Sequence, residues 1–231
     1  MARCVIGLGG PKSSSWPFLR RHVGRAFVEH VAEAQGFGPW RPVSVALADF
    51  AEHGSGVVLC RLWPDCTEEE LQAQQAARQA LKYLGVRAPQ HFVLAHAETR
   101  KACGRLLVQE GPQLAPAWAK PVIRAVSPEY RPGVPNVEQP TRLVFGAARA
   151  TDRRFKAFYA SFSEGETQPM PRRHEVGGPS RSNLAPQMDR FGDSKMSGRE
   201  AMAILQSAFP AAYEWLLKPS GSLPLACFNM L

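Results

Sequence analysis

Apolar and polar positions alternate along this chain in a way that predicts short strands and amphipathic helices. Compact apolar runs, rich in residues that favour β-structure, predict strands over residues 3–8, 43–48, 57–62, 92–95, 106–108 and 143–147. Between the first two runs, apolar residues at helical spacing predict a helix over residues 21–35, which Gly36 ends. Strands that are interleaved with helices favour an α/β domain.

The helix after the third predicted strand has a clear start signal. Thr67 followed by Glu70 forms a capping box, and the acidic residues there suit the positive end of a helix dipole. Its buried face is predicted to contain Leu71, Ala77, Leu81 and Leu84. A shorter helix is expected over residues 117–126, in a stretch whose prolines exclude longer regular elements.

The C-terminal part of the chain differs in composition. Residues 167–199 are rich in Pro, Gly, Ser and Arg, which predicts an extended basic arm. A final helix is predicted from Ser197, with Glu200 completing a capping box, and is expected to break at Pro210. A docking surface for a protein partner is predicted from the apolar residues Trp215, Leu216, Leu217, Phe228 and Leu231. The chain thus divides into a domain of residues 1–166 and an extension of residues 167–231.

Composition and charge narrow the classes of function. The chain has 231 residues, of which 45% are apolar and 21% charged, as is typical of globular proteins. Lys and Arg total 28 against 20 Asp and Glu, and the formal net charge of +8 favours a polyanionic partner. No apolar run is long enough for a membrane-spanning helix. The first strand begins so early that no signal peptide is expected before it.

The sequence predicts neither a metal nor a cofactor. Its five cysteines are scattered without a C-x-x-C pair, which indicates a reducing compartment and speaks against a disulfide framework or a zinc site. The pairs Cys60/Cys66 and His91/His96 have no second pair at matching spacing. The turn from Gly7 to Pro11 lacks the full G-x-G-x-x-G of a dinucleotide-binding loop, and no acidic residue follows at the end of a second strand.

A series of short motifs follows in a fixed order. Ile6-Gly7-Leu8-Gly9-Gly10-Pro11 precedes Arg21-His22-Val23-Gly24 and Phe27-Val28, and further segments lie at 58–64, 93–96, 142–149 and 158–166. In this order they resemble I-V-G-L-G-N-P-G, T-R-H-N-V-G, F-V-D, L-L-K-P, V-V-H, R-L-R-I-G-I-G-R and V-L-x-x-F-S-x-x-E of bacterial-type peptidyl-tRNA hydrolases. The resemblance spans about residues 3–166. It implies a single α/β domain with a mixed, largely parallel sheet flanked by helices.

The resemblance also implies a site, in which several family residues are replaced. In that family hydrolysis centres on a histidine held by a carboxylate, and His22 stands at the histidine position. The carboxylate position is Ala97, the asparagine of the glycine turn is Gly10, and the Gly/Asn-rich loop is replaced around Ala117. Glu98 is the neighbouring acid, but on a strand it points away from the face of Ala97. Because an imidazole without an orienting carboxylate is a weak general base, the sequence predicts a pseudoenzyme without hydrolytic activity.

Basic residues suggest where an RNA would bind. Extended basic segments bind nucleic acid mainly through phosphate contacts, with little sequence specificity. The residues predicted to bind RNA are Arg20, Arg21, Lys120, Arg124, Arg149, Arg153, Arg154, Arg172, Arg173, Arg181 and Arg190. Trp16, Trp40 and Trp118 are candidates for stacking on unpaired bases, with core packing as the alternative.

These observations predict a catalytically inactive RNA-binding protein with the peptidyl-tRNA hydrolase fold. We expect it in a ribonucleoprotein, as a component of the large ribosomal subunit or an assembly factor, in the mitochondrion or otherwise in the cytoplasm. Its expected partners are rRNA or tRNA-like RNA and ribosomal or assembly proteins, and no membrane. Two alternatives stay open: a divergent but active esterase on peptidyl- or aminoacyl-tRNA, and a protein-binding adaptor that uses the apolar C-terminus.

Overall fold

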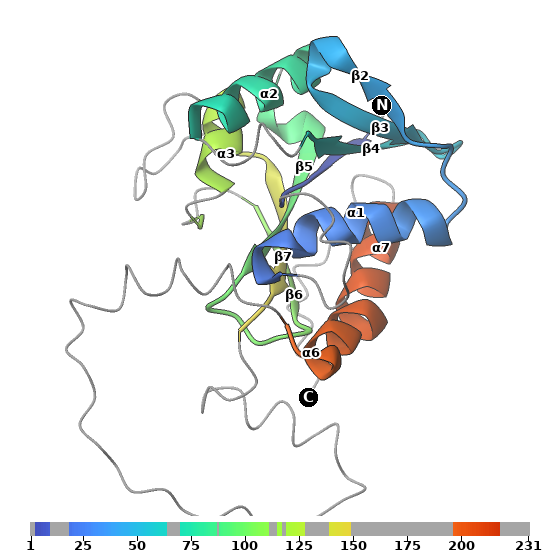
Figure 1. The fold of residues 1–231 in the computed structure, drawn as a ribbon, viewed down its shortest axis with the longest axis vertical. Coiled ribbons are helices and arrows are strands. Elements are labelled where there is room, and N and C mark those ends of the chain that lie inside the picture. The colour runs from blue at the N-terminus through green and yellow to red at the C-terminus, as the bar shows by residue number, and fades with distance from the viewer. Residues whose placement is uncertain are drawn as a thin grey trace, which may run out of the picture.

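The computed structural model describes residues 3–9, 19–63, 70–86, 88–110, 115–116, 119–127, 139–148 and 196–217. In these residues seven strands form one sheet, in the order β2-β3-β4-β1-β5-β7-β6 (Figure 1). The strands are β1 Arg3–Gly7, β2 Arg41–Val43, β3 Ala48–Glu52, β4 Val57–Leu62, β5 Phe92–Glu98, β6 Leu106–Gln109 and β7 Thr141–Gly146.

The sheet is parallel in its centre and antiparallel at both edges. Strand β1 runs parallel to β4 and β5, and β5 runs parallel to β7. The pairs β2–β3, β3–β4 and β6–β7 are antiparallel. This arrangement confirms the predicted α/β class with a mixed sheet flanked by helices.

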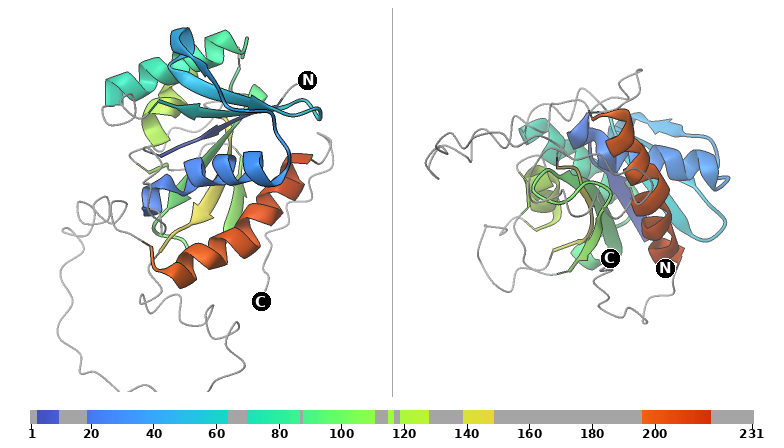
Figure 2. Two further views of the ribbon diagram at one scale, coloured as in Figure 1. Left: turned by 45° about the vertical axis from the view of Figure 1, so that its right-hand side comes forward. Right: turned by 90° about the horizontal axis from the view of Figure 1, so that it is seen from below.

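Helices cover both faces of the sheet, as Figure 2 shows from two further sides. One face carries α1 (Val23–Ala34) and the C-terminal helical segment, which consists of α6 (Gly198–Ala203), the π-helical turn η8 (Ile204–Ala208) and α7 (Phe209–Leu217). The other face carries α2 (Glu70–Tyr83) and α3 (Lys120–Val126). Each pair of helices closes its own apolar cluster against the sheet.

Three phenylalanines join the C-terminal segment to the rest of the core. The ring of Phe209 lies 5.2 Å from that of Phe27 on α1 and 5.3 Å from that of Phe145 on β7, centroid to centroid. Phe27 and Phe145 are 5.0 Å apart. The described end of the predicted extension therefore shares a core with the first 148 residues. The predicted boundary at residue 166 and most of the basic arm lie outside the described residues.

The predicted strand over residues 43–48 is wrong. The chain bends there through a 3-10 turn (Ser44–Ala46), and Leu47 takes a left-handed conformation with φ of 49°. This bend folds β3 back onto β2, so that Val43 pairs with Ala48. An apolar run that turns a corner has the same composition as a buried strand, which explains the error.

Leu71 is not part of the buried face of α2, because its side chain is 79% exposed. The buried positions are Ala73, Ala76, Ala77, Ala80 and Leu81, which follow helical spacing among themselves. Leu71 falls out of step with that spacing. The predicted capping box at Thr67 lies outside the described residues.

Pro210 does not end the final helix. It is the second residue of α7, in a first turn where a missing N–H is tolerated, and the wider turn η8 precedes it. The predicted docking surface is also partly wrong: Leu216 is buried and Trp215 packs against the core, while Leu217 is 46% exposed. Phe228 and Leu231 lie outside the described residues. No helix in the described part of the chain is long and apolar enough to cross a membrane.

Candidate functional site

The candidate site lies at the carboxyl ends of the central parallel strands. Strand β1 has β4 on one side and β5 on the other, so the order of the sheet reverses at β1. In open α/β sheets, ligands bind outside the carboxyl ends of the strands at such a reversal. The residues that follow β1 here are Leu8 and Gly9, the start of the glycine turn.

Close backbone packing fixes this turn against α1 and β5. The amide of Leu8 donates to the carbonyl of Ala95 at 2.9 Å, and the amide of Arg25 donates to the carbonyl of Leu8 at 2.9 Å. Gly9 has a φ of +147°, and a Cβ on it would lie 2.6 Å from the Cα of His22. The glycine turn and the backbone of His22 therefore hold each other in place.

His22 is the last residue of the 3-10 turn η1 (Arg20–His22) and the residue directly before α1. It is buried, with 6% exposure. Ala97 packs in the same apolar cluster as Val23, the first residue of α1, so β5 turns its Ala97 face toward α1. The position predicted for an orienting carboxylate therefore faces the helix that His22 precedes, but it holds a methyl group.

The spacing around His22 departs from the family motif. In T-R-H-N-V-G the histidine stands three residues before the glycine, whereas His22 stands two residues before Gly24. Gly24 is fixed by the sheet, because a Cβ on it would lie 2.1 Å from the carbonyl oxygen of Ala95. The imidazole is thus one residue closer to this fixed point than the motif has it, and Arg21 stands at the three-residue spacing.

Glu98 does not take the place of the missing carboxylate. Its Oε1 accepts from the amide and Nε of Arg100 at 3.1 and 2.8 Å, and its Oε2 accepts from NH2 of Arg100 at 2.7 Å. Burial alone would raise the pKa of Glu98, but the bonds and charge of Arg100 outweigh it and hold that pKa below its usual value. Glu98 is therefore an ionised partner of Arg100.

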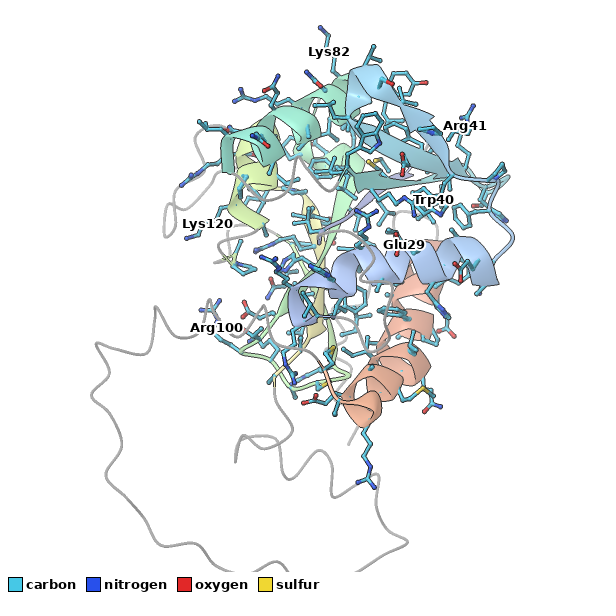
Figure 3. All side chains as sticks on the ribbon, viewed as in Figure 1. Glu29, Trp40, Arg41, Lys82, Arg100 and Lys120 are labelled. Carbon is cyan, nitrogen blue, oxygen red and sulfur yellow. The ribbon has the colours of Figure 1, made fainter. Side chains whose placement is uncertain are left out.

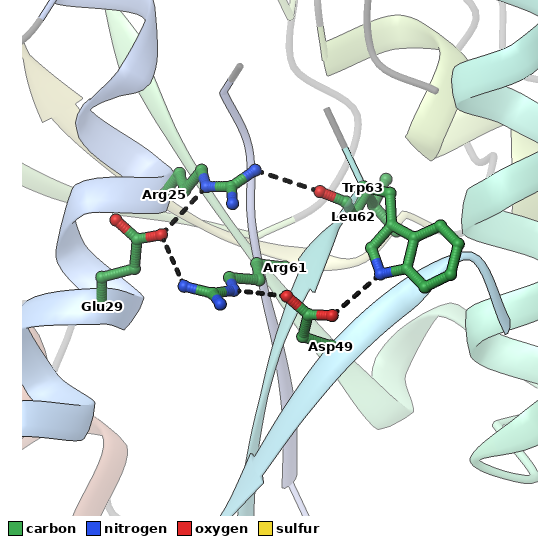
Figure 4. A network of polar contacts seen from close by, with 6 residues as sticks. All are labelled: Arg25, Glu29, Asp49, Arg61, Leu62 and Trp63. Carbon is green, nitrogen blue, oxygen red and sulfur yellow. Dashed lines mark hydrogen bonds and ion pairs between the residues drawn. The ribbon is translucent and has the colours of Figure 1, made fainter. Parts of the chain in front are cut away.

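A network of charged side chains connects α1 with strands β3 and β4 (Figure 4). Oε1 of Glu29 accepts from Nε of Arg25 at 3.0 Å and from NH1 of Arg61 at 2.9 Å. Asp49 accepts from Nε of Arg61 and from Nε1 of Trp63, both at 2.8 Å. Two cations and two anions balance, which is how buried charges are usually accommodated.

Sequence reasoning missed this network, although two signals were present. Arg25 and Glu29 are four residues apart on an otherwise apolar helix face, and Arg61 interrupts an apolar strand. Arg25 also donates to the carbonyl of Leu62 at 3.1 Å, which ties α1 to the end of β4 beside the glycine turn. The guanidinium of Arg61 lies 4.4 Å from the ring centroid of Trp40, so this tryptophan packs within the network.

His96 lies on β5 and is 1% exposed. Its Nδ1 lies 2.9 Å from the carbonyl of Ala97, and because a carbonyl only accepts, Nδ1 carries the proton. The pKa of His96 is lowered from 6.5 to about 4, mainly by burial and to a smaller extent by the charge of nearby Arg142, although the Ala97 bond and the charge of Glu98 oppose this. The imidazole is therefore neutral near pH 7. In the described residues, no group of three or more His, Cys, Asp or Glu side chains that could hold a metal ion occurs.

The low pKa of His96 predicts a loss of stability in acid. Between about pH 6.5 and 4 the unfolded chain binds a proton that the folded chain does not, so the free energy of unfolding falls as the pH drops through this window. The loss reaches about 3 kcal/mol at the lower end. Urea unfolding of the wild type and of His96→Gln at pH 7 and pH 4.5 measures it. An equal drop in both proteins would contradict this role of His96.

The predicted RNA-binding residues are placed differently from one another. Arg20 is 3% exposed and bonds to Glu200, so its guanidinium is enclosed and speaks against a phosphate contact. Arg21 is half-buried, and Lys120 and Arg124 are half-buried four residues apart on α3. The residues from Arg149 to Arg190 lie outside the described part, as do Gly10, Ala117, Trp16 and Trp118, and their roles stay predictions.

A basic turn between β5 and β6 was missing from the predicted RNA-binding set. It holds Arg100, Lys101 and Arg105 directly after the carboxyl end of β5. Lys101 is exposed, and Arg100 keeps 47% of its side chain exposed beside Glu98. Figure 3 shows Arg100 and Lys120 along the same flank of the molecule, on the left of the view. This flank offers positive charge next to the carboxyl ends of the strands.

Comparison with known proteins gives these features a family context. No model of a known protein family matches the chain. A peptidyl-tRNA hydrolase of Paracoccus denitrificans is 30% identical over 109 residues, which cover 47% of this chain and 44% of that protein. The crystal structure of peptidyl-tRNA hydrolase from Acinetobacter baumannii superposes with a TM-score of 0.55 at 16% identity, over 94% of this chain and 85% of that one. This chain has the peptidyl-tRNA hydrolase fold.

The likeness to peptidyl-tRNA hydrolases corrects one prediction. The chain matches less than half the length of the curated relative, so the comparison bears on fold and descent. The two proteins named above are peptidyl-tRNA hydrolases, which are enzymes, and nothing in the described residues establishes a loss of activity. The prediction of a pseudoenzyme is therefore wrong. It equated the lack of a carboxylate at position 97, which is alanine, with a lack of catalysis. An imidazole without that partner still has its own basicity.

Proposed function

We propose that this chain binds peptidyl- or aminoacyl-tRNA and hydrolyses the ester bond between the RNA and its peptide or amino acid, with His22 as the general base. The proposal rests on one observation above all: His22 lies beside the glycine turn at the carboxyl ends of β1 and β5, in a fold shared with peptidyl-tRNA hydrolase. Fold alone does not define function, so the residues of the site must carry the chemistry.

In the proposed reaction, the imidazole of His22 accepts a proton from water while the water oxygen attacks the ester carbonyl carbon. The carbonyl oxygen then holds the negative charge of the tetrahedral intermediate. Collapse of the intermediate breaks the bond to the ribose oxygen, which takes the proton back from the imidazolium. The products are a carboxylic acid and an RNA with a free hydroxyl. With Ala97 in the carboxylate position, nothing at that position stabilises the imidazolium, and we expect slow turnover.

Positive charge beside the site supports binding of the RNA part. The turn with Arg100, Lys101 and Arg105 and the α3 residues Lys120 and Arg124 offer guanidinium and ammonium groups for phosphates. Binding through phosphates releases counterions and confers affinity without sequence specificity. The charge surplus of the whole chain also supports a place in a ribonucleoprotein, and we propose a ribosomal particle of the mitochondrion as that place. Co-sedimentation with ribosomal particles tests this part of the proposal. A chain that does not co-sediment with them even before a high-salt wash would contradict it.

Ala97→Asp is expected to raise the rate of ester hydrolysis at least about tenfold, because the new carboxylate would orient and stabilise the imidazolium of His22. The measurement is release of the N-blocked amino acid from N-acetyl-aminoacyl-tRNA, under single-turnover conditions. It also tests directly whether the one-residue shift of His22 leaves the imidazole within reach of that carboxylate.

Ala97→Asn is the matched control, since it has the same shape without the charge. It is expected to leave the rate within about twofold of the wild type, while Ala97→Asp combined with His22→Ala should lose the gain. Because Ala97 is buried, all variants are first compared by their unfolding transitions. If folded Ala97→Asp is no faster than Ala97→Asn, then a carboxylate at position 97 does not reach the imidazole of His22, which would contradict the placement of the base opposite that position.

A further inference from the structure

A buried ion pair joins η1, the turn before α1, to the start of the C-terminal helical segment. NH2 of Arg20 donates to Oε2 of Glu200 at 2.7 Å, and the two side chains are 3% and 4% exposed. NH1 of Arg20 donates to the carbonyls of Ala147 and Ala148 at 2.7 and 3.1 Å. The guanidinium of Arg20 thus connects η1, to which it belongs, with the residues after β7 and with α6.

Glu200 is itself held in a defined position. Its Oε2 accepts from the amide of Ser197 at 2.7 Å, and its own amide donates to Oγ of Ser197 at 3.3 Å, which completes the capping box of α6. Its carbonyl accepts from Sγ of Cys103 at 3.3 Å. The capping box therefore fixes the carboxylate that meets Arg20, and the bond from Cys103 holds the backbone of Glu200 to the turn between β5 and β6.

Docking of the helix alone does not require this ion pair. Ile204, Phe209 and Leu216 already bury an apolar face against the sheet, and Oγ of Ser207 donates to the carbonyl of Gly104 at 3.0 Å. An apolar pair of similar volume in place of a buried ion pair often stabilises a fold equally well. The ion pair adds a defined orientation of η1 relative to α6. The planar guanidinium of Arg20 donates in fixed directions to the Glu200 carboxylate and to the carbonyls of Ala147 and Ala148.

The ion pair lies next to the candidate base. Arg20 and His22 belong to the same 3-10 turn, and the backbone amide of His22 bonds to the carbonyl of Leu19 at 2.9 Å. The glycine turn restrains His22 from the other side, through the contact at Gly9. The position of η1 is therefore set by Gly9 on one side and by Arg20 on the other.

We infer that Arg20 and Glu200 are positioning residues that set the orientation of His22, so that the first turn of α6, where Glu200 lies, contributes to the functional site. The inference rests on the proposed function for its effect on hydrolysis. Its structural part is the control of His22 through Arg20 by Glu200, which is 180 positions from Arg20 in the chain. This part does not depend on hydrolysis and has its own readout.

The test compares Glu200→Gln with Ser207→Ala in the full chain. Glu200→Gln removes the charge that holds Arg20, whereas Ser207→Ala weakens the same helical segment away from Arg20. Two-dimensional NMR follows the pH titration of the His22 imidazole, and single-turnover hydrolysis follows the rate. We expect Glu200→Gln to move the His22 resonances and titration and to lower the rate about tenfold or more at unchanged RNA affinity. Ser207→Ala should leave both unchanged.

Two further variants keep the inference testable if Glu200→Gln unfolds. The double variant Arg20→Met with Glu200→Met removes both charges together, so no buried charge is left unpaired, and it should fold yet show the displaced His22 signals. Arg20→Lys keeps the positive charge, so the pH titration of its His22 imidazole should lie between that of the wild type and that of the double variant. Unchanged His22 signals in the folded double variant would overturn the inference. If His22 moves as expected but even the wild type lacks hydrolysis, the proposed function fails and the positioning role stands.

Discussion

Replacing Gly24 with alanine is expected to lower the free energy of unfolding by about 3 kcal/mol or more. A Cβ at this position would lie 2.1 Å from the carbonyl oxygen and 2.6 Å from the carbonyl carbon of Ala95, both of which are backbone atoms of the central strand β5. Neither atom can move without disturbing the sheet, so α1 must withdraw, and overpacking of this kind is costly. Urea unfolding followed by circular dichroism measures the change.

Gly198→Ala provides the matched control. A Cβ there would meet nothing within 4 Å, and the position lies in the first turn of α6. We expect this variant to be as stable as the wild type or slightly more stable, because alanine restricts the unfolded chain. A Gly24→Ala protein as stable as Gly198→Ala would mean that α1 does not approach β5 as closely as described, and the placement of His22 would fall with it.

Phe209→Ala is expected to cost about 3–5 kcal/mol of unfolding free energy. The ring is 1% exposed and packs against Phe27 and Phe145, so its removal leaves a cavity between α1, α7 and the sheet. Because these contacts hold the C-terminal segment on the core, the same variant should increase hydrogen exchange throughout residues 196–217. Thermal unfolding and exchange measured by mass spectrometry report the two effects.

Leu217→Ala is the control for this prediction. Leu217 is 46% exposed at the end of the same helix, and its truncation should change stability by less than about 0.5 kcal/mol. If the two truncations cost the same, the C-terminal segment is not part of the core. The inference about Arg20 and Glu200 would then lose its structural basis.

Local pattern was sufficient to predict most of the fold. Strands β1 and β4 and helix α1 end within a few residues of their predicted limits, because each is a self-contained apolar run or an amphipathic stretch with a glycine stop. The hairpin corner at Leu47 was missed because an apolar bend looks like a strand until its pairing is known. The predicted helix end at Pro210 was wrong because the effect of a proline depends on whether it lies in the first turn of a helix or in its interior.

The candidate site was predictable where it depended on sequence order alone. The alternation of strand β5 separated Ala97 from Glu98, and the structure agrees, with Ala97 in the core under α1 and Glu98 bonded to Arg100. Arg20 was assigned to an RNA surface on its charge. Its actual partner, Glu200, is too distant in the chain for spacing to indicate the contact, and only the packing of the C-terminal segment brings the two together.

The account depends most on the hydrolytic role of His22, and the rate of ester hydrolysis tests it most directly. Purified full-length chain is mixed with N-acetyl-aminoacyl-tRNA, and release of the blocked amino acid is compared with the spontaneous rate in buffer. We predict that the wild type exceeds the spontaneous rate and that folded His22→Ala, with tRNA affinity unchanged, falls back to it. A wild type that binds the tRNA without accelerating hydrolysis, or a His22→Ala variant as fast as the wild type, would contradict the account.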